Sequence, residues 1–157
     1  MSQHLATIRW TRSGPDFLER CYSREHTWAF DGGAIVPASP SPCSVPAPWS
    51  NAASVDPEEA LVASVSSCHM LWFLHVAVDS GFIADSYEDA ASGIMTKNDD
   101  GIPWVSRITL RPRVTWSGEV LPTPAEVQHL HHEAHRRCFI AASIRSEVII
   151  EADLSAE

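Results

Sequence analysis

The sequence predicts an α+β fold in which two helices pack on antiparallel strands, and three observations support that prediction. Several short stretches alternate apolar and polar residues with the period of two that is typical of half-buried strands. Two longer stretches begin with helix start signals, and one of them is apolar on almost every face. The elements follow the order β-β-loop-α-β-β-α-β. The length of 157 residues fits a single domain, which we place over residues 1–157.

The composition restricts the classes of function. With 45% apolar and 20% charged residues the chain is not intrinsically disordered. Its 20 acidic residues exceed its 11 basic ones, which gives a formal net charge of -9, so we expect no nucleic-acid partner. No long apolar run follows the N-terminus, so we expect a cytoplasmic protein. The four cysteines are then not a disulfide framework, and they are candidates for catalysis, metal binding or the core.

The first strands are expected near the N-terminus. Residues 5–12 and residues 21–30 place their bulky apolar side chains at alternate positions, and the second stretch ends in a turn at residues 31–33. Residues 36–51 hold five of the eleven prolines, which excludes a helix or a central strand. We expect an ordered loop or an edge segment there.

The first helix is expected from residue 57 to about residue 80. Asp56 can cap its exposed amides, Pro57 suits its first turn, and Gly81 ends it. A transmembrane segment is not expected, because the apolar run is barely long enough and polar side chains interrupt it at Ser64, Ser66, Ser67, His69 and His75. A helix this apolar in a soluble protein should be buried on all sides, between a sheet and another subunit.

The second half of the chain continues the pattern. Residues 86–97 and 104–118 are expected as two strands joined by a turn at residues 98–101. A second helix over residues 125–138 follows, with Thr123 as its candidate cap. Residues 143–154 are expected as the closing strand.

Two cysteines lie on the expected helices. Cys68 is in the middle of the first helix among small residues, and Cys138 is at the end of the second. Either thiol could be an inert part of the core. If the two meet where the helices pack, a thiolate can attack a peroxide to give a sulfenic acid, and the second thiol can condense with it. A positive partner such as an arginine should then lie near Cys68, whereas Cys21 and Cys43 have no assigned role.

Histidines offer a different chemistry. His131 and His135 share one face of the second helix, and Cys138 lies three residues beyond, so these three side chains could together hold zinc. The string HHEAH is not the HExxH pattern of metalloproteases, and no CxxC pair is present. No metal site is therefore assigned.

Two segments resemble a known family. VDPEEALVASVSSCHM resembles the first cysteine region of the OsmC/Ohr family of organic hydroperoxide reductases, and AHRRCFIAAS resembles the second. The resemblance implies an OsmC-like two-layer fold with a central buried helix, in an intertwined homodimer with active sites at the subunit interface. The Cys-Pro-Tyr of the Ohr branch is here replaced by Cys138-Phe139-Ile140, which favours an OsmC-like branch over Ohr itself.

The resemblance also implies residue roles. Cys68 would be the peroxidatic cysteine and Cys138 the resolving one, while Glu58 matches the glutamate that pairs with an active-site arginine. Arg24 is our first choice for that arginine, with Arg20 and Arg12 as alternates. Ten residues of helix separate Glu58 from Cys68 by about 15 Å along the axis and about 280° around it. If Glu58 serves Cys68, it must therefore come from the partner chain.

The sequence thus predicts a thiol-dependent peroxidase. Arg24 would hold Cys68 as the thiolate, Glu58 would orient the guanidinium, and Cys138 would close a disulfide that an external dithiol reopens without a cofactor. Apolar neighbours of the nucleophile favour an organic hydroperoxide as substrate, namely Met70, Leu71, Trp72 and Phe73. His69 lies about 100° from Cys68 around the helix, so we expect it in the core rather than acting as a base.

A non-enzymatic protein is the alternative. In that case the dimeric scaffold is a binding or stress-associated protein, and the cysteines are core residues. It would be favoured if the Cys68 and Cys138 sulfurs were too far apart to bridge.

Overall fold

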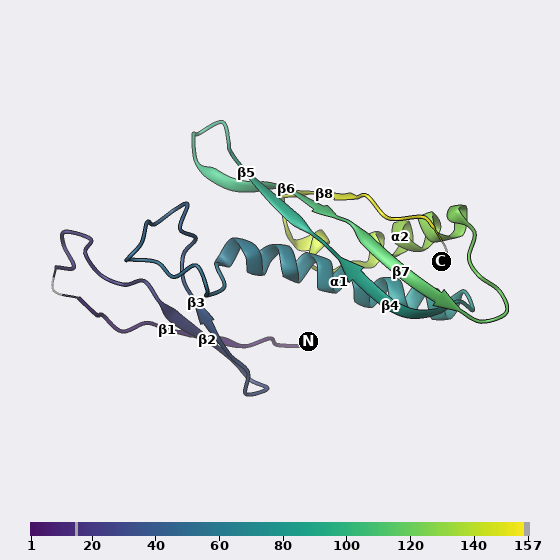
Figure 1. The fold of residues 1–157 in the computed structure, drawn as a ribbon, viewed down its shortest axis with the longest axis horizontal. Coiled ribbons are helices and arrows are strands. Elements are labelled where there is room, and N and C mark those ends of the chain that lie inside the picture. Colours follow the sequence, from purple (N-terminus) through teal and green to yellow (C-terminus); the bar gives the residue numbers. More distant parts are fainter. Residues whose placement is uncertain (15, 156–157) are drawn as a thin grey trace. The chain divides into compact units, whose positions relative to one another are not determined.

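The computed structural model describes residues 1–14 and 16–155. The chain forms two compact units, Met1–Ala60 and Leu61–Glu157. The α+β fold class is confirmed, with two α-helices and mainly antiparallel strands among the described residues (Figure 1).

The first unit contains a three-stranded antiparallel sheet. Its strands are β1 (Ala6–Arg9), β2 (His26–Phe30) and β3 (Ile35–Ala38), in the order β1-β2-β3. β2 begins at His26 rather than at residue 21, because an isolated bridge between Asp16 and Cys21 closes a separate loop. β3 lies within the segment expected as a loop or an edge, and it tolerates Pro37 because it is an edge strand.

This first unit has almost no core of its own. Among its described residues only Ala38, Ser39 and Asp56 are buried. Large apolar side chains remain exposed instead, at Leu5, Ile8, Trp10, Phe17, Leu18, Phe30 and Ile35. Because burial of apolar surface is the main favourable term in folding, an exposed apolar surface of this kind marks an interaction site.

Helix α1 (Pro57–Asp79) begins and ends as the sequence predicts. The Asp56 carboxylate accepts a hydrogen bond from the Glu59 amide at 2.7 Å, and the Glu59 carboxylate accepts one from the Asp56 amide at 3.2 Å. Gly81 follows the helix with φ of 80°, the left-handed conformation that favours glycine. By length and composition alone α1 could cross a membrane, a criterion that the core helix of a water-soluble protein also meets.

The second unit contains a long hairpin whose two arms each form two strands (Figure 1). One arm is β4 (Ile83–Asp89) and β5 (Ser92–Lys97), and the other is β6 (Pro103–Leu110) and β7 (Pro112–Ser117). The single strands expected for these arms are each interrupted, and the Asp89 carboxylate accepts the Arg111 amide at 2.6 Å where the breaks meet. β8 (Glu147–Ile150) pairs with β6 in parallel.

Helix α2 (Pro124–Arg137) has the expected cap. Thr123 and Glu126 form a capping box, in which each side chain accepts a hydrogen bond from the other residue's backbone amide. A short 3-10 helix, η1 (Ala141–Ser143), follows and leads into β8.

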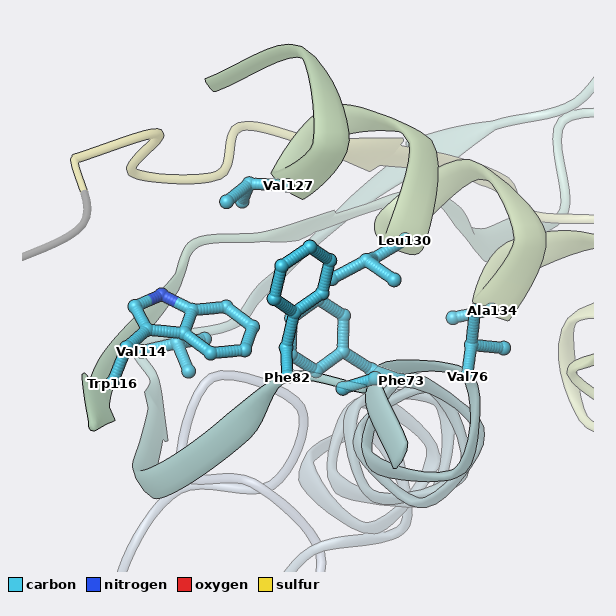
Figure 2. Close-up of a cluster of buried hydrophobic side chains, with 9 residues drawn as sticks. Phe73, Val76, Phe82, Val114, Trp116, Val127, Leu130 and Ala134 are labelled. Carbon is cyan, nitrogen blue, oxygen red and sulfur yellow. The ribbon is translucent and has the colours of Figure 1, made fainter. Parts of the chain in front are cut away.

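Two apolar clusters hold the second unit together. One joins the second half of α1 to β7 and α2 and contains Phe73, Val76, Ala77, Phe82, Val114, Trp116, Val127, Leu130 and Ala134 (Figure 2). The other joins the first half of α1 to β6 and contains Val65, Val105, Ile108 and Leu110. The two clusters hold the parts of α1 before and after residue 68, so residue 68 lies between them.

Candidate functional site

Cys68 lines a pocket beside the middle of α1. The pocket has a volume of about 510 Å³, and its other lining residues are Ser64, Ser67, Leu71, Trp72, His75 and Phe139. Residues 64, 68, 71 and 75 follow the spacing of one helix face. Small hydroxyl side chains thus flank the thiol on one side, and larger side chains form the rest of the wall.

Aromatic rings form one wall of this pocket. The Trp72 indole meets the Phe139 ring edge to face at a centroid distance of 5.4 Å, and it meets the His75 ring in the same way at 5.5 Å. The Arg137 guanidinium lies 5.9 Å from the centre of the same indole. Leu71 and Phe139 are 62% and 69% exposed, so the pocket has apolar walls that face solvent in the isolated chain.

The apolar neighbours predicted for the nucleophile divide into two groups. Leu71 and Trp72 line the pocket, as expected. Phe73 does not, because it is fully buried in the cluster that joins α1 to α2. Met70 is half-buried and lies outside the pocket lining.

Cys138 lies at the C-terminal cap of α2 and is 1% exposed. Its amide donates to the His135 carbonyl at 3.2 Å, and its sulfur accepts a hydrogen bond from the Ala141 amide at 3.4 Å. Burial, followed by the neighbouring Cys68 thiol, raises the pKa of Cys138 to about 11. Cys138 is therefore a protonated thiol at neutral pH.

The structure brings Cys68 and Cys138 together. Both are free thiols, and the Cys68 thiol is close enough to act on the titration of Cys138. They differ in exposure, because Cys68 lines the pocket whereas Cys138 is buried. An accessible thiol next to a second thiol is an arrangement that permits attack on a substrate followed by disulfide closure.

Arg24 lies in the first unit and lines a second pocket, of about 480 Å³. Its guanidinium is 4.2 Å from the centre of the Tyr22 ring and donates to the carbonyl oxygens of Tyr22, at 3.1 Å, and Arg20, at 3.5 Å. The remaining lining is mostly aromatic or apolar, namely Ile8, Trp10, Phe17, His26, Pro40 and Pro57. Arg24 forms no ion pair with the described residues.

Glu58 lies in the first turn of α1 and is half-buried. Its carboxylate makes no hydrogen bond or ion pair with the described residues, so the expected pair with Arg24 is not formed within the isolated chain. Cys68 is ten residues further along the same continuous helix, so about 15 Å of axial rise separates the two residues. The roles of Glu58 and Arg24 stay predictions.

A buried pair of histidines joins α1 to α2. His69 and His131 are 1% and 3% exposed, and Nε2 of His69 is 3.0 Å from Nδ1 of His131. Burial lowers the pKa of His69 to about 4 and that of His131 to about 3. His69 is thus in the core, as expected. The zinc hypothesis gains no support, because no three ligand side chains within residues 1–14 and 16–155 are placed to hold a metal ion.

Phe139 and His75 are the pocket residues that sequence reasoning did not select. His75 could have been found from its helical spacing of seven residues from Cys68, which places both on one face. Phe139 carries no such signal, because its position depends on how the chain turns after α2 ends.

The two-layer fold and the adjacent thiols define a class of small α+β protein with a dithiol beside an apolar pocket. The chain belongs to the OsmC-like protein family, whose model matches residues 50–153. No curated protein matches the sequence.

Solved structures agree with this assignment. An OsmC-like protein of unknown function from Vibrio cholerae is 47% identical, with a TM-score of 0.94 over 98% of this chain and 100% of that one. An organic hydroperoxide resistance protein from Legionella pneumophila is 13% identical, with a TM-score of 0.65 over 97% of this chain and 96% of that one. The organic hydroperoxide resistance protein OhrB of Bacillus subtilis is 20% identical, with a TM-score of 0.62 over 95% of this chain and 98% of that one. The last two show similarity of fold.

Proposed function

We propose that the protein is a thiol-dependent peroxidase that reduces organic hydroperoxides to alcohols. The observation that carries this proposal is the pairing of a pocket-lining Cys68 with a buried, adjacent Cys138. Family membership and the fold shared with organic hydroperoxide resistance proteins support it.

The reaction proceeds in three balanced steps. The Cys68 thiolate attacks the distal peroxide oxygen, the O–O bond breaks, and the leaving alkoxide takes up a proton to give the alcohol and a Cys68 sulfenic acid. The Cys138 sulfur then attacks the Cys68 sulfur, and the sulfenic hydroxyl leaves as water with the Cys138 proton. An external dithiol of the cytoplasm reduces the disulfide by exchange and is itself oxidised.

The asymmetry between the thiols supports this order of reaction. A hydroperoxide entering the pocket would meet Cys68, whereas Cys138 is buried and does not line the pocket. The raised pKa of Cys138 keeps it protonated and unreactive toward peroxide. The walls formed by Leu71, Trp72 and Phe139 favour a substrate with an apolar organic group over hydrogen peroxide.

The proposal requires a homodimer. The first unit exposes its apolar side chains, and α1 exposes Leu71 and Val78, so each chain presents surface that a second copy can cover. Arg24 and Glu58 of one subunit would then serve Cys68 of the other, Arg24 by stabilising the thiolate and the leaving alkoxide.

Steady-state peroxidase assays test the proposal. Cumene hydroperoxide and a dithiol reductant are supplied to the purified protein, and consumption of peroxide is followed. We expect Cys68→Ser to abolish turnover and Cys43→Ser, which alters an exposed cysteine outside the site, to retain it. Full activity of Cys68→Ser would refute the proposal and favour a non-enzymatic binding protein.

A further inference from the structure

The helices that carry the two thiols are joined by the buried hydrogen bond between His69 and His131. Its nitrogen atoms are 3.0 Å apart, and the planes of the two rings are 7° apart. Since both histidines are neutral, one ring donates its N–H and the other accepts. In a buried site such a bond is stronger than in water, and it fixes the rings relative to each other.

Each histidine lies on the helix that carries or ends at one of the thiols. His69 directly follows Cys68 on α1. His131 precedes Cys138 by seven residues, which is about two helical turns and brings the two to nearly the same face of α2. The His131 ring also packs against Phe73, at a centroid distance of 4.2 Å. Phe73 belongs to the core cluster shown in Figure 2. A shift or rotation of α2 relative to α1 would have to break this bond.

We propose that His69 and His131 are positioning residues that hold the Cys138 sulfur in line for attack on oxidised Cys68. The proposal rests on the function proposed above, and it adds a role for two side chains that touch neither the pocket nor the substrate. Attack at a sulfur requires the incoming sulfur to approach along the bond that breaks, so a small displacement slows closure strongly. The pair therefore acts on the resolving step and leaves the reaction of Cys68 with peroxide unchanged.

The variants separate positioning from simple stability. His131→Leu removes the hydrogen bond but leaves the buried His69 ring without this partner. An unpaired buried polar group by itself lowers the stability of the folded protein. The double variant His69→Leu/His131→Leu removes both polar groups, so it keeps an apolar interior and is the folded reference. His131→Asn restores a polar group at the position of Nδ1. His132→Leu is the matched control, since His132 is the exposed neighbour on the same helix.

Two oxidants are used on the reduced full-length protein, cumene hydroperoxide and diamide. Each oxidant leaves a group on the Cys68 sulfur that Cys138 can displace when it forms the disulfide. The displaced group leaves as water after cumene hydroperoxide and as the hydrazine after diamide. Quenched samples are resolved by intact mass to give the rates of Cys68 oxidation and of disulfide closure. Removing the bond is expected to slow closure about 10- to 100-fold with either oxidant and to increase sulfinic acid formation with peroxide.

The outcomes are separable. Slowed closure in the double variant, partial recovery in His131→Asn and an unchanged His132→Leu support the positioning role. Closure at the wild-type rate in the double variant, or equal slowing in His132→Leu, overturns it. If the wild-type protein closes the disulfide with diamide but does not react with peroxide, the proposed peroxidase function fails, and the positioning role is decided from the diamide rates alone.

Discussion

Cys68 and Cys138 are neighbours in unequal surroundings. Cys68 lines a pocket of about 510 Å³, whereas Cys138 is 1% exposed and its pKa is raised to about 11. Cys68 lies on α1 between two apolar clusters, and Cys138 lies at the cap of α2. This difference in exposure leads to distinct expectations for each cysteine.

Replacing Cys138 by serine should leave the first step intact and block the second. We expect one equivalent of cumene hydroperoxide to oxidise Cys68 at the wild-type rate, because Cys138 does not line the pocket. The sulfenic acid then has no resolving partner, so it persists, reacts with dimedone and proceeds to the sulfinic acid with excess peroxide. Intact-mass measurements check this, with Cys43→Ser as the control. If Cys68 were no longer oxidised by the hydroperoxide in Cys138→Ser, the proposed order of the thiols would be wrong.

The aromatic wall should set the preference for bulky substrates. Trp72→Ala removes the edge-to-face contact with Phe139, and we expect the KM for cumene hydroperoxide to rise about 3- to 10-fold, with a smaller change for tert-butyl hydroperoxide. Trp104→Ala is the control, because that indole lies against Arg145 and not in the pocket. Equal changes for the two substrates would argue against an apolar recognition role for Trp72.

Mixed dimers can show which subunit supplies the arginine. Cys68→Ser and Arg24→Ala chains should each be inactive alone. If Arg24 serves the partner's Cys68, random subunit exchange should restore about a quarter of the wild-type activity, because half of the dimers are mixed and each has one complete site. As a comparison, the same subunit exchange is carried out with Arg20→Ala chains in place of Arg24→Ala chains. Mixtures that remain inactive would place the arginine in the same chain as the cysteine it serves.

The buried histidines should make stability depend on pH. The pKa is lowered to about 4 for His69 and about 3 for His131, mainly by burial, and the neighbouring His135 adds to the effect on His69. Below about pH 6.5 the unfolded chain binds protons at these sites and the folded chain does not, so stability falls as the pH is lowered toward 4. Urea midpoints between pH 4 and 7 check this. His69→Leu/His131→Leu should show a shallower fall, and an unchanged slope would contradict the assignment.

The capping box of α2 should contribute measurably to stability. Thr123→Ala removes the side chain that caps the Glu126 amide and should lower the free energy of unfolding by about 1 kcal/mol. Thr123→Ser keeps the hydroxyl and should lose much less. Urea denaturation of both variants gives the comparison, and an equal loss would indicate that the threonine methyl group matters rather than the cap.

Local chemistry made the helices predictable from sequence, whereas long-range pairing did not. Asp56, Pro57 and Gly81 mark the ends of α1 because capping depends on neighbouring residues alone. The parallel pairing of β8 with β6 was not foreseen, since a short apolar strand carries no information about its direction. Where both hairpin arms are interrupted, the Asp89 carboxylate accepts the Arg111 amide, a contact between distant residues that no local pattern indicates.

The site was predictable to a similar extent. Cys68 and Cys138 were selected from their helical settings and from the family resemblance, and the structure brings them together. The hydrogen bond between His69 and His131 was not foreseen, because the sequence places each on its own helix but does not give the rotation of one helix against the other. Phe139 was not selected as a pocket residue, because its position depends on how the chain turns after α2 ends.

The most direct test of the proposed dithiol chemistry is peptide mass spectrometry of the reduced wild-type protein after one equivalent of cumene hydroperoxide. We predict a disulfide between Cys68 and Cys138, one equivalent of alcohol released, and Cys21 and Cys43 still as free thiols. Recovery of all four cysteines as thiols with the hydroperoxide unconsumed, or a disulfide that involves Cys21 or Cys43 instead, would contradict it.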